Sequence, residues 1–380
     1  MTYIHIIVRM NIMSILQKIG VAIMHIGMPL VLWYHALIIN PFINIATEDA
    51  KGFEKAANIA LIPTQYILAG KIAYPVEEDG RTIYRLKQRF DYNLHFWVKT
   101  GASFCALSYS LSIGTLLKAI SYLDSGVRKK HQLIKEYLNR TDVVSNKEYY
   151  EKLGLDVGDM NEAEWIDLTW YKRRPGDENH LAREKEALKE VFQILKKHNI
   201  PCWVDCGTCL GAYRYGGVIP WDMDIDIAIL EPDFENVRRA LNELDKDKYE
   251  VQDWSNRCLP NTYLKIFVKQ GEAMIDIYHF AVHPENKTVQ YILSNEYSIF
   301  LPESWRIRER RFTVPMAYDT VFPLKKALFD GIEVFVPNKT KKYLQSFYGE
   351  NIEPAKVYDE NTCQYEKDLT HPYWNRAYVH

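Results

Sequence analysis

Aspartate recurs at every second position in one short segment, Pro220-Trp-Asp-Met-Asp-Ile-Asp-Ile-Ala-Ile-Leu230. Successive side chains of a β-strand point to opposite faces, so Asp222, Asp224 and Asp226 share one face if the strand begins early enough, and isoleucines fill the other. Three carboxylates on one face repel each other unless a cation joins them, and oxygen-only ligands suit Mg²⁺ or Mn²⁺. The segment therefore predicts a strand with a metal site; the alternative is a solvent-exposed acidic edge.

A second strand is expected at Ala273–Phe280, where Asp276 stands alone among apolar residues. A buried aspartate is costly unless it is paired or binds a metal. If this strand neighbours the first, Asp276 becomes a third metal ligand or a general base; otherwise it caps a loop or pairs with a base such as Lys265. Lys265 lies in the run Tyr263–Lys269, which reads as the preceding strand of a hairpin and could bring its ammonium group to a phosphate or to solvent.

The segment before the acidic strand has the order helix, strand, turn and helix. Apolar residues recur at helical spacing in the stretch 182–198, and Cys202–Val204 is a short apolar run. Gly207-Thr208 follows that run and opens a helix, whose free backbone N–H groups and dipole suit a phosphate. Arg214, near the end of this helix, could clamp a phosphate with its guanidinium or could lie on the surface.

Three runs in the first third of the chain lack Asp, Glu, Lys and Arg: residues 19–47, 56–70 and 100–117. The first is longer than the ~20 residues that cross a bilayer core. The runs predict a membrane-associated helical region over residues 1–125; the alternative is a set of buried core helices in a soluble domain. If two runs span, the flanking basic residues place everything downstream on the cytoplasmic face, and if only the first spans, the remainder lies on the opposite face.

The length and the charge of the chain limit the number of domains and the possible classes of protein. The chain has 380 residues, which predicts two or three domains. Residues 126–180 are polar and broken by glycine and proline, which favours a linker with short helices, and residues 181–380 form the expected catalytic domain. Lys and Arg number 47 and Asp and Glu 49, a balance that is not typical of a general nucleic-acid-binding protein. The predicted fold class is α/β (α+β), a mixed sheet with flanking helices preceded by the apolar helical region.

Residues 203–227, Trp-Val-Asp-Cys-Gly-Thr-Cys-Leu-Gly-Ala-Tyr-Arg-Tyr-Gly-Gly-Val-Ile-Pro-Trp-Asp-Met-Asp-Ile-Asp-Ile, resemble the signature of the LicD/fukutin family. That signature is an aromatic-x-Asp-x-Gly-Thr-Leu-Leu-Gly, an Arg, and then Ile-Pro-Trp-Asp-x-Asp-Ile-Asp. Phe322-Pro-Leu, Phe329-x-Gly-Ile-x-Val and Tyr348-Gly resemble the family's C-terminal part, so the resemblance covers about residues 181–358. Cys209 stands where the family usually has Leu, an exchange between apolar side chains.

The resemblance implies a nucleotidyltransferase-type fold and the transfer of a phospho-alcohol from a CDP-activated donor to a glycan hydroxyl. Bacterial members transfer phosphocholine to cell-surface polysaccharide such as lipopolysaccharide, and fukutin-like members transfer ribitol phosphate. A membrane-bound N-terminal region would suit a lipid-linked or surface glycan acceptor. Two alternatives stay open: a nucleotidyltransferase that attaches a nucleotide to a small molecule or protein, and a non-enzymatic membrane-associated relative. The presence of both Asp224 and Asp226 argues against the second.

The resemblance also implies roles for individual residues. Gly207 and Thr208 would hold the donor phosphates, and Arg214 would steady them. Asp222 would support a metal ligand or act as the base for the acceptor hydroxyl. The implied ligands of Mg²⁺ or Mn²⁺ are Asp224, Asp226 and Asp276.

Overall fold

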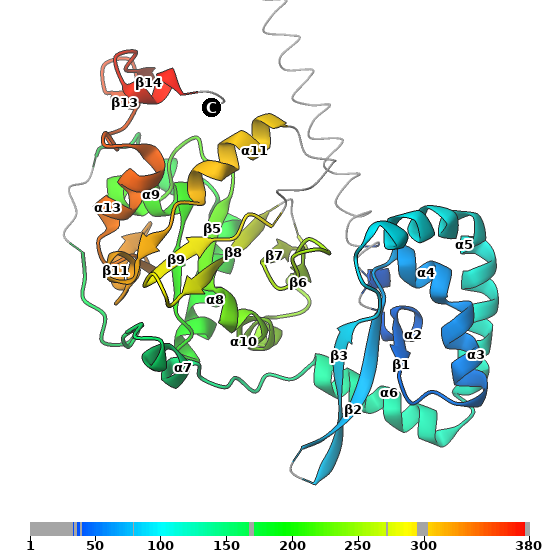
Figure 1. The fold of residues 1–380 in the computed structure, drawn as a ribbon. Helices are drawn as coiled ribbons and strands as arrows, with labels where there is room; N and C mark the ends of the chain where they lie inside the picture. Colours follow the sequence, from blue (N-terminus) through cyan, green and yellow to red (C-terminus); the bar gives the residue numbers. More distant parts are fainter. Residues whose placement is uncertain are drawn as a thin grey trace, which may run out of the picture. The chain divides into compact units, whose positions relative to one another are not determined.

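The computed structural model of the protein describes residues 33, 36–38, 40–78, 80–166, 171–270, 273–294 and 303–376. Most of the first apolar run, residues 19–47, lies outside the described residues. The chain divides into two compact units, residues 1–140 and 141–380 (Figure 1). The linker expected at 126–180 is therefore divided between them, because α6 (Ser125–Leu138) belongs to the first unit and α7 (Lys147–Lys152) to the second.

The N-terminal unit contains a small sheet that the expectation of a helical region did not include. β2 (Lys71–Glu78) and β3 (Arg81–Gln88) form an antiparallel hairpin, and β1 (Ile45–Thr47) pairs with β2 in parallel. Ala73 and Tyr84 of the hairpin pack with Ile45 and with Ile134 of α6 in a small core. From residue 40 to α6, the described part of this unit contains the helices α2 (Pro41–Asn44), α3 (Gly52–Ala60), α4 (Ile62–Ile67) and α5 (Leu94–Ser121).

The second and third uncharged runs pack against each other in this unit. Residues 100–117 lie within α5, and residues 56–70 form most of α3 and α4, which both contact α5. The contact is close: Ser110 Oγ donates to the Ala60 carbonyl at 2.7 Å, and a Cβ on Gly114 would lie 2.6 Å from the Leu61 side chain. Among the described residues, α5 is the one helix that is long and apolar enough to cross a membrane by these criteria alone.

The C-terminal unit is built on a mixed seven-stranded sheet, which confirms the predicted α/β class (Figure 1). The long strand β8 (Met274–His283) is its centre, with β5 (Ile225–Leu230) running parallel to it. β7 (Tyr263–Val268) and β9 (Thr288–Tyr291) pair antiparallel with successive parts of β8. The remaining strands of the sheet are β4 (Cys202–Val204), β6 (Tyr249–Asp253) and β10 (Met316–Ala317).

Helices cover this sheet as the apolar spacing predicted. α8 (Ala182–Lys197) contacts β5, β7 and β8, and α9 (Cys206–Tyr215) contacts β4 and β5. The other α-helices of this unit are α10 (Phe234–Ala240), α11 (Glu303–Glu309), α12 (Tyr318–Val321) and α13 (Thr340–Tyr348). Two hairpins complete it, β11 (Lys325–Phe329) with β12 (Ile332–Val336), and β13 (Lys356–Asp359) with β14 (Gln364–Lys367).

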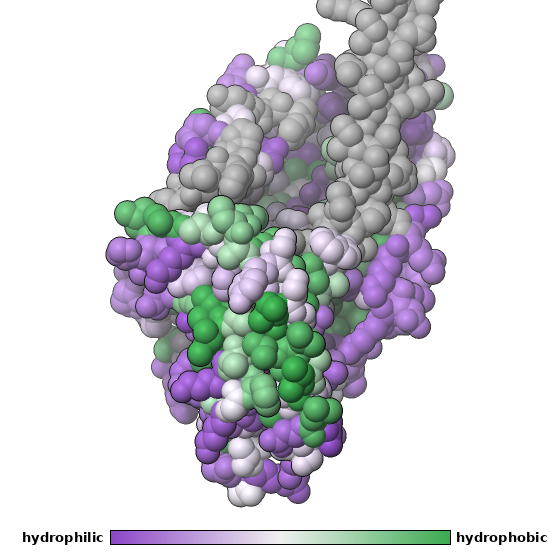
Figure 2. Space-filling model, turned by 90° about the vertical axis from the view of Figure 1, so that its right-hand side faces the viewer, coloured by the Kyte–Doolittle hydropathy of each residue, from purple (hydrophilic) through white to green (hydrophobic). Residues whose placement is uncertain are grey.

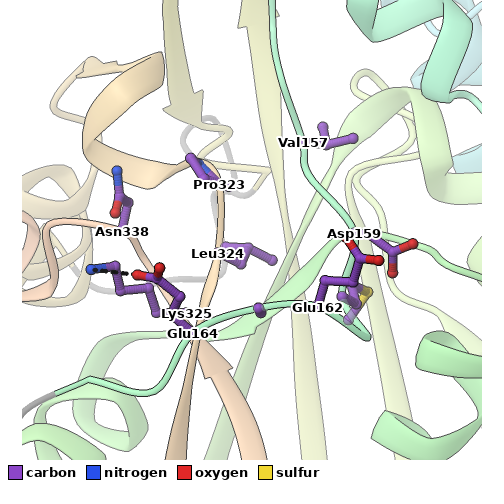
Figure 3. Close-up of a pocket in the computed structure, with 10 residues that line it drawn as sticks. Val157, Asp159, Glu162, Glu164, Pro323, Leu324, Lys325 and Asn338 are labelled. Atoms are coloured by element: carbon purple, nitrogen blue, oxygen red, sulfur yellow. Dashed lines mark ion pairs between the residues drawn. The ribbon is translucent and has the colours of Figure 1, made fainter.

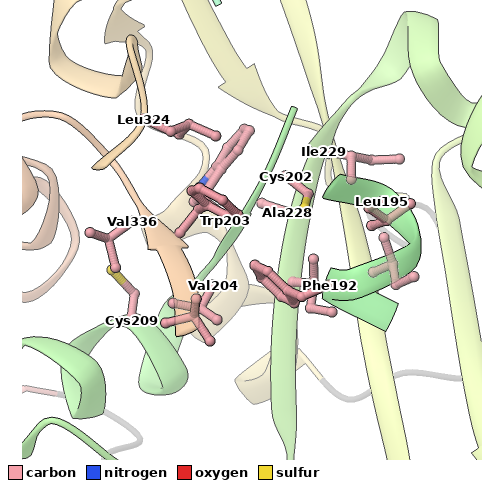
Figure 4. Close-up of a cluster of buried hydrophobic side chains, with 14 of the residues drawn as sticks. Phe192, Leu195, Cys202, Trp203, Val204, Cys209, Ala228, Ile229, Leu324 and Val336 are labelled. Carbon is pink, nitrogen blue, oxygen red and sulfur yellow. The ribbon is translucent and has the colours of Figure 1, made fainter. Parts of the chain in front are cut away.

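Trp203 of β4 lies in the hydrophobic core of this unit (Figure 4). Its ring is fully buried and meets Phe280 and Phe322 edge-on, at centroid distances of 5.1 and 5.7 Å. Its indole N–H donates to the Tyr343 hydroxyl of α13 at 3.1 Å, so the buried polar atom is satisfied. This core holds β4 and β5 rigidly beneath the segment that carries the aspartates.

Two glycines of α5 allow a matched test of the packing in the N-terminal unit. Gly114→Ala should lower the free energy of unfolding by about 1–3 kcal/mol, because the new methyl group overlaps Leu61. Gly101→Ala, where no atom lies within 4 Å of the new Cβ, should leave stability unchanged or raise it by up to about 1 kcal/mol through helix propensity. Urea unfolding followed by circular dichroism measures both. Equal effects of the two substitutions would contradict the close packing of α5 on α3 and α4.

Candidate active site

Strand register places three charged side chains in one row across the sheet. Asp226 of β5 is the direct partner of Asp276 in the parallel pair β5–β8, and Lys265 of β7 is the partner of Asp276 on the other side. Directly paired residues project to the same face of a sheet. The two aspartates therefore stand side by side, and Lys265 Nζ lies 2.8 Å from Asp276 Oδ1. Asp276 thus joins the acidic group and also pairs with Lys265, and its role as a metal ligand or general base stays a prediction.

Asp224 completes the group from the turn before β5. One carboxylate oxygen each of Asp224, Asp226 and Asp276 lies within 4.8 Å of the others. The strand begins only at Ile225, so alternation along a strand does not explain the position of Asp224. The turn brings it to the cluster instead. Asp222 lies further back, outside this set of three.

Burial and mutual repulsion act together on this cluster. Burial raises the pKa of Asp226 well above its ordinary value, and the charges of Asp224 and Asp276 raise it further. Burial also raises the pKa of Asp224, as does Asp276, while Lys265 and Arg308 oppose the rise. Asp226 and Asp276 are only 7% and 6% exposed, which excludes a simple acidic surface edge.

A divalent cation with oxygen ligands fits these residues. The Oδ1 atom of Asp226 is buried and has no hydrogen-bond partner within the described part of the chain. A buried carboxylate oxygen without a partner costs free energy, and coordination of a cation removes that cost. Three carboxylates with one ammonium group leave a net negative site, and carboxylate oxygens are the ligands that Mg²⁺ prefers.

The first turn of α9 positions the acidic segment. The backbone N–H of Asp226 donates to Thr208 Oγ1 at 2.9 Å, so the threonine side chain fixes the start of β5. A Cβ on Gly207 would lie 2.5 Å from Asp222 Oδ2, so only glycine lets that carboxylate approach the helix. Burial, with the charge of Asp224, raises the pKa of Asp222 to about 7. The contacts of Gly207 and Thr208 in this structure thus go to the aspartates, and contact with phosphate stays a prediction.

Arg214 does not have the expected role. Its Nε and Nη2 atoms donate to the backbone carbonyls of Ile352 and Glu353, both at 2.6 Å, and its side chain is buried. The guanidinium therefore ties α9 to the segment after α13. Both the phosphate clamp and the surface position considered from the sequence are wrong for this geometry.

Sequence reasoning missed two residues of α11 that lie within electrostatic range of the cluster. Burial raises the pKa of Glu309, Arg308 opposes the rise, and the charges of Asp224 and Asp276 add to it. Arg308 Nε lies 3.2 Å from Glu309 Oε1, and the arginine side chain is 32% exposed. The signal in the sequence was the basic run at residues 306–311, Arg-Ile-Arg-Glu-Arg-Arg.

Two cavities of this unit lie apart from the aspartate cluster. One of about 310 Å³ lies between the segment 157–164 and the residues around Pro323, where Lys325 and Glu164 approach to 3.9 Å (Figure 3). Another of about 390 Å³ is lined by Arg173, Tyr215 and Asp330, among others. Neither contains Asp224, Asp226 or Asp276, so charge and burial identify the candidate site, and cavity volume does not.

Comparisons with known proteins agree with this placement. Residues 199–339 match the nucleotidyltransferase domain described as LicD/FKTN/FKRP. An uncharacterized protein of Rickettsia typhi is 29% identical over 177 residues, which are 47% of this chain and 49% of that protein. Ribitol-5-phosphate transferase FKTN of Mus musculus is 27% identical over 47% of this chain and 35% of its own length. Ribitol 5-phosphate transferase FKRP of Homo sapiens is 22% identical over 54% of this chain and 38% of its own length.

The matched stretches thus span about half or less of these curated relatives. The family match begins just before β4, ends just before α13, and includes Asp224, Asp226, Lys265 and Asp276. The resemblance in the sequence is confirmed over this domain. Over residues 199–339 the chain is similar to the nucleotidyltransferase domain of the LicD/FKTN/FKRP family.

Proposed function

We propose that the chain is a divalent-metal-dependent transferase that moves a phospho-alcohol from a CDP-activated donor to a hydroxyl of a cell-surface or lipid-linked glycan. The observation that carries this proposal is the buried row Asp226–Asp276–Lys265, with Asp224 beside it, in a domain of this family. Relatives named as ribitol-phosphate transferases support a transferase and favour a phospho-alcohol as the transferred group. Ribitol phosphate and phosphocholine are both candidates.

The three aspartates would hold Mg²⁺ or Mn²⁺, which when bound would neutralise negative charge on the donor's pyrophosphate. Phosphoryl transfer depends mainly on positioning and on electrostatic stabilisation, and needs little covalent help from the protein. Lys265 fixes the Asp276 carboxylate through their 2.8 Å ion pair, and Thr208 fixes the start of β5. Asp222, two residues before Asp224, would accept the proton of the acceptor hydroxyl.

Arg308 replaces Arg214 in this proposal as the arginine that binds donor phosphate. It lies within electrostatic range of Asp224 and is partly exposed, so a substrate can reach it. An arginine guanidinium can donate two parallel hydrogen bonds to a phosphate, which adds geometric specificity to charge. Glu309, which pairs with Arg308, would hold the guanidinium in place until the donor binds.

Metal binding is testable without turnover. Mn²⁺ should raise the melting temperature of the purified protein, and Asp226→Asn should abolish this increase while leaving the metal-free variant at least as stable as the wild type, because it removes one of three repelling charges. Asp247→Asn, which makes the same charge change in an exposed turn before β6, is the matched control and should keep the response to Mn²⁺. An unchanged response in Asp226→Asn would contradict the metal site.

The donor can be identified by incubating the protein with Mg²⁺ or Mn²⁺ and, in turn, CDP-choline, CDP-ribitol, CDP-glycerol, CTP and ATP. We expect CMP release from one CDP-alcohol, detected by mass spectrometry and lost with EDTA and in Asp224→Ala or Asp226→Ala, which should remain folded. Activity that survives either substitution would overturn the assignment of the cluster. Pyrophosphate release from CTP or ATP would instead favour a nucleotidyltransferase.

Substitutions of Arg308 and Arg214 should have different effects, the first on donor binding and the second on the stability of the fold. Arg308→Ala should raise the donor KM roughly tenfold or more, because a hydrogen bond between charged groups contributes about 1.5–3 kcal/mol, and Arg308→Lys should recover part of the loss. Arg214→Ala should lower the melting temperature, because it removes two hydrogen bonds, one of them to the carbonyl of the buried Ile352, and should leave the donor KM of the folded fraction unchanged. Steady-state kinetics and thermal unfolding measure the two effects, with Arg238→Ala on α10 as a surface control. A KM effect in Arg214→Ala alone would reverse the assignment.

A further inference from the structure

Polar and apolar side chains are distributed over α5 in the reverse of the way found on helices of soluble domains. A helix on the surface of a globular protein normally turns its apolar stripe to the core. The side of α5 that packs against α3 and α4 is largely small or polar, and its buried residues include Ser103, Ser110, Gly114, Lys118 and Ser121.

The opposite side of α5 is exposed and apolar. Figure 2 shows hydrophobic side chains gathered on the face of the molecule that includes this helix. The exposed fraction reaches 77% at Leu94 and 69% at Tyr109. The main large apolar residues on this outer face are Leu94, Trp97, Val98, Phe104, Tyr109 and Leu116.

Charge and hydrogen bonding on α5 both suit contact with hydrocarbon. No Asp, Glu, Lys or Arg occurs from Thr100 to Leu117, and Lys118 turns inward to Asn58 Oδ1 at 3.4 Å. The hydroxyl of Ser112, on the exposed side, donates to the Ser108 carbonyl at 2.7 Å, which satisfies it within the helix. An apolar medium requires such internal satisfaction, because it offers polar groups no partners.

The charged residues around the outer face of α5 favour a lipid bilayer as its binding partner. Exposed basic residues stand near the ends of α5 and on the neighbouring α3, and the exposed acids of the same segments are Glu48, Asp49, Asp91 and Asp124. These basic residues are Lys51, Lys55, Lys99, Arg128 and Lys129. Basic residues at the rim of an apolar face with tryptophan and phenylalanine are typical of helices that bind anionic membranes.

The rest of the unit indicates that α5 lies along the membrane and does not cross it. α3, which packs along α5, exposes Lys55, and the β2–β3 hairpin exposes Glu77, Arg81 and Arg85. A crossing α5 would carry α3 and α4 into the hydrocarbon core, where charged side chains are costly. Arg89 would go with them, because it donates to the Asn58 carbonyl of α3 and to the Gln65 side chain of α4. A helix that lies flat places only its outer face in the apolar layer.

We propose that the outer face of α5 is a membrane-binding surface, on which the N-terminal unit rests at an anionic lipid bilayer with α5 parallel to the bilayer plane. The inference goes beyond the proposed transferase activity and does not depend on it. It also differs from the spanning arrangement expected from the sequence, because the surface involved belongs to the uncharged run 100–117 and the helix remains fixed to its unit. A bilayer, rather than another protein, is the occupant that the uncharged face and its basic ends favour.

Cys105 provides a probe within this face. It is exposed on α5, and two other exposed cysteines, Cys258 and Cys363, lie in the C-terminal unit. The test uses the full chain with Cys258→Ser and Cys363→Ser, labelled at Cys105 with an environment-sensitive nitrobenzoxadiazole dye. The matched control keeps Cys363 as its exposed cysteine, with Cys105→Ser and Cys258→Ser. Vesicles contain phosphatidylcholine and phosphatidylserine, with or without a nitroxide near the lipid headgroup.

We expect vesicles to shift the emission of the Cys105 label to the blue and the shallow nitroxide to quench it, with neither change at Cys363. Replacing two outer residues, Phe104→Glu and Tyr109→Glu, should lower the vesicle partition coefficient by more than about tenfold, because two large apolar contacts are lost. Val357→Glu, an exposed apolar position of β13, should leave partitioning unchanged. CMP release from a soluble donor should be unaffected by the substitutions on α5 and by Val357→Glu. A failed test of the membrane surface can therefore be distinguished from a failure of the proposed transferase function.

Three results would overturn the proposal. Vesicle flotation with no change at Cys105 would assign membrane attachment to another segment, such as the run 19–47. A blue shift at Cys105 without vesicles, together with concentration-dependent dimers in light scattering, would assign the face to a second copy of the chain. Quenching by a nitroxide at the bilayer centre, and not by the shallow one, would indicate a crossing helix.

Discussion

The parallel pairing of β5 with β8 brings two aspartates together in the C-terminal unit. Because Asp226 and Asp276 are direct partners, neither can turn away without breaking the register of a sheet whose other face is packed with isoleucines. A shift of the β5–β8 register by one residue would turn those isoleucines to the other face of the sheet and bring the aspartates into the hydrophobic core. The hydrophobic core therefore holds the charges in place, and the repulsion is compensated locally, by Lys265 in the structure and by a cation in the proposal.

The features of the site that depend on local periodicity could be predicted from the sequence. Alternation identified β5, and an aspartate among apolar residues identified Asp276 in β8. The pairing of these strands could only be proposed as a possibility, because almost fifty residues separate them and several strand orders would satisfy the same alternation. Asp224 was expected to join the other aspartates by alternation along a strand. It does lie beside them, but it belongs to the turn before β5, so strand alternation is not the reason.

The two arginines show why the rest could not be predicted. Arg214 matches a family motif, but its partners are carbonyls of residues 352 and 353, which no local pattern connects to α9. Arg308 belongs to a run that reads as ordinary surface charge, and only the tertiary position of α11 brings it near the aspartates. The β2–β3 hairpin was missed for a related reason: average apolarity over the first third of the chain concealed the strand-like alternation of residues 71–88.

Two buried carboxylates, Glu54 and Asp226, differ in how their charge is compensated. In the N-terminal unit, the buried Glu54 accepts a hydrogen bond from Thr47 at 2.8 Å and pairs with Lys130 at 2.9 Å, so its charge is compensated internally. In the C-terminal unit, Asp226 keeps an oxygen without a partner among the described residues. A buried oxygen without a partner costs free energy, and an external ligand that binds it removes that cost. Glu54 therefore needs no ligand from outside its unit, whereas Asp226 is the carboxylate to which the proposed cation would bind.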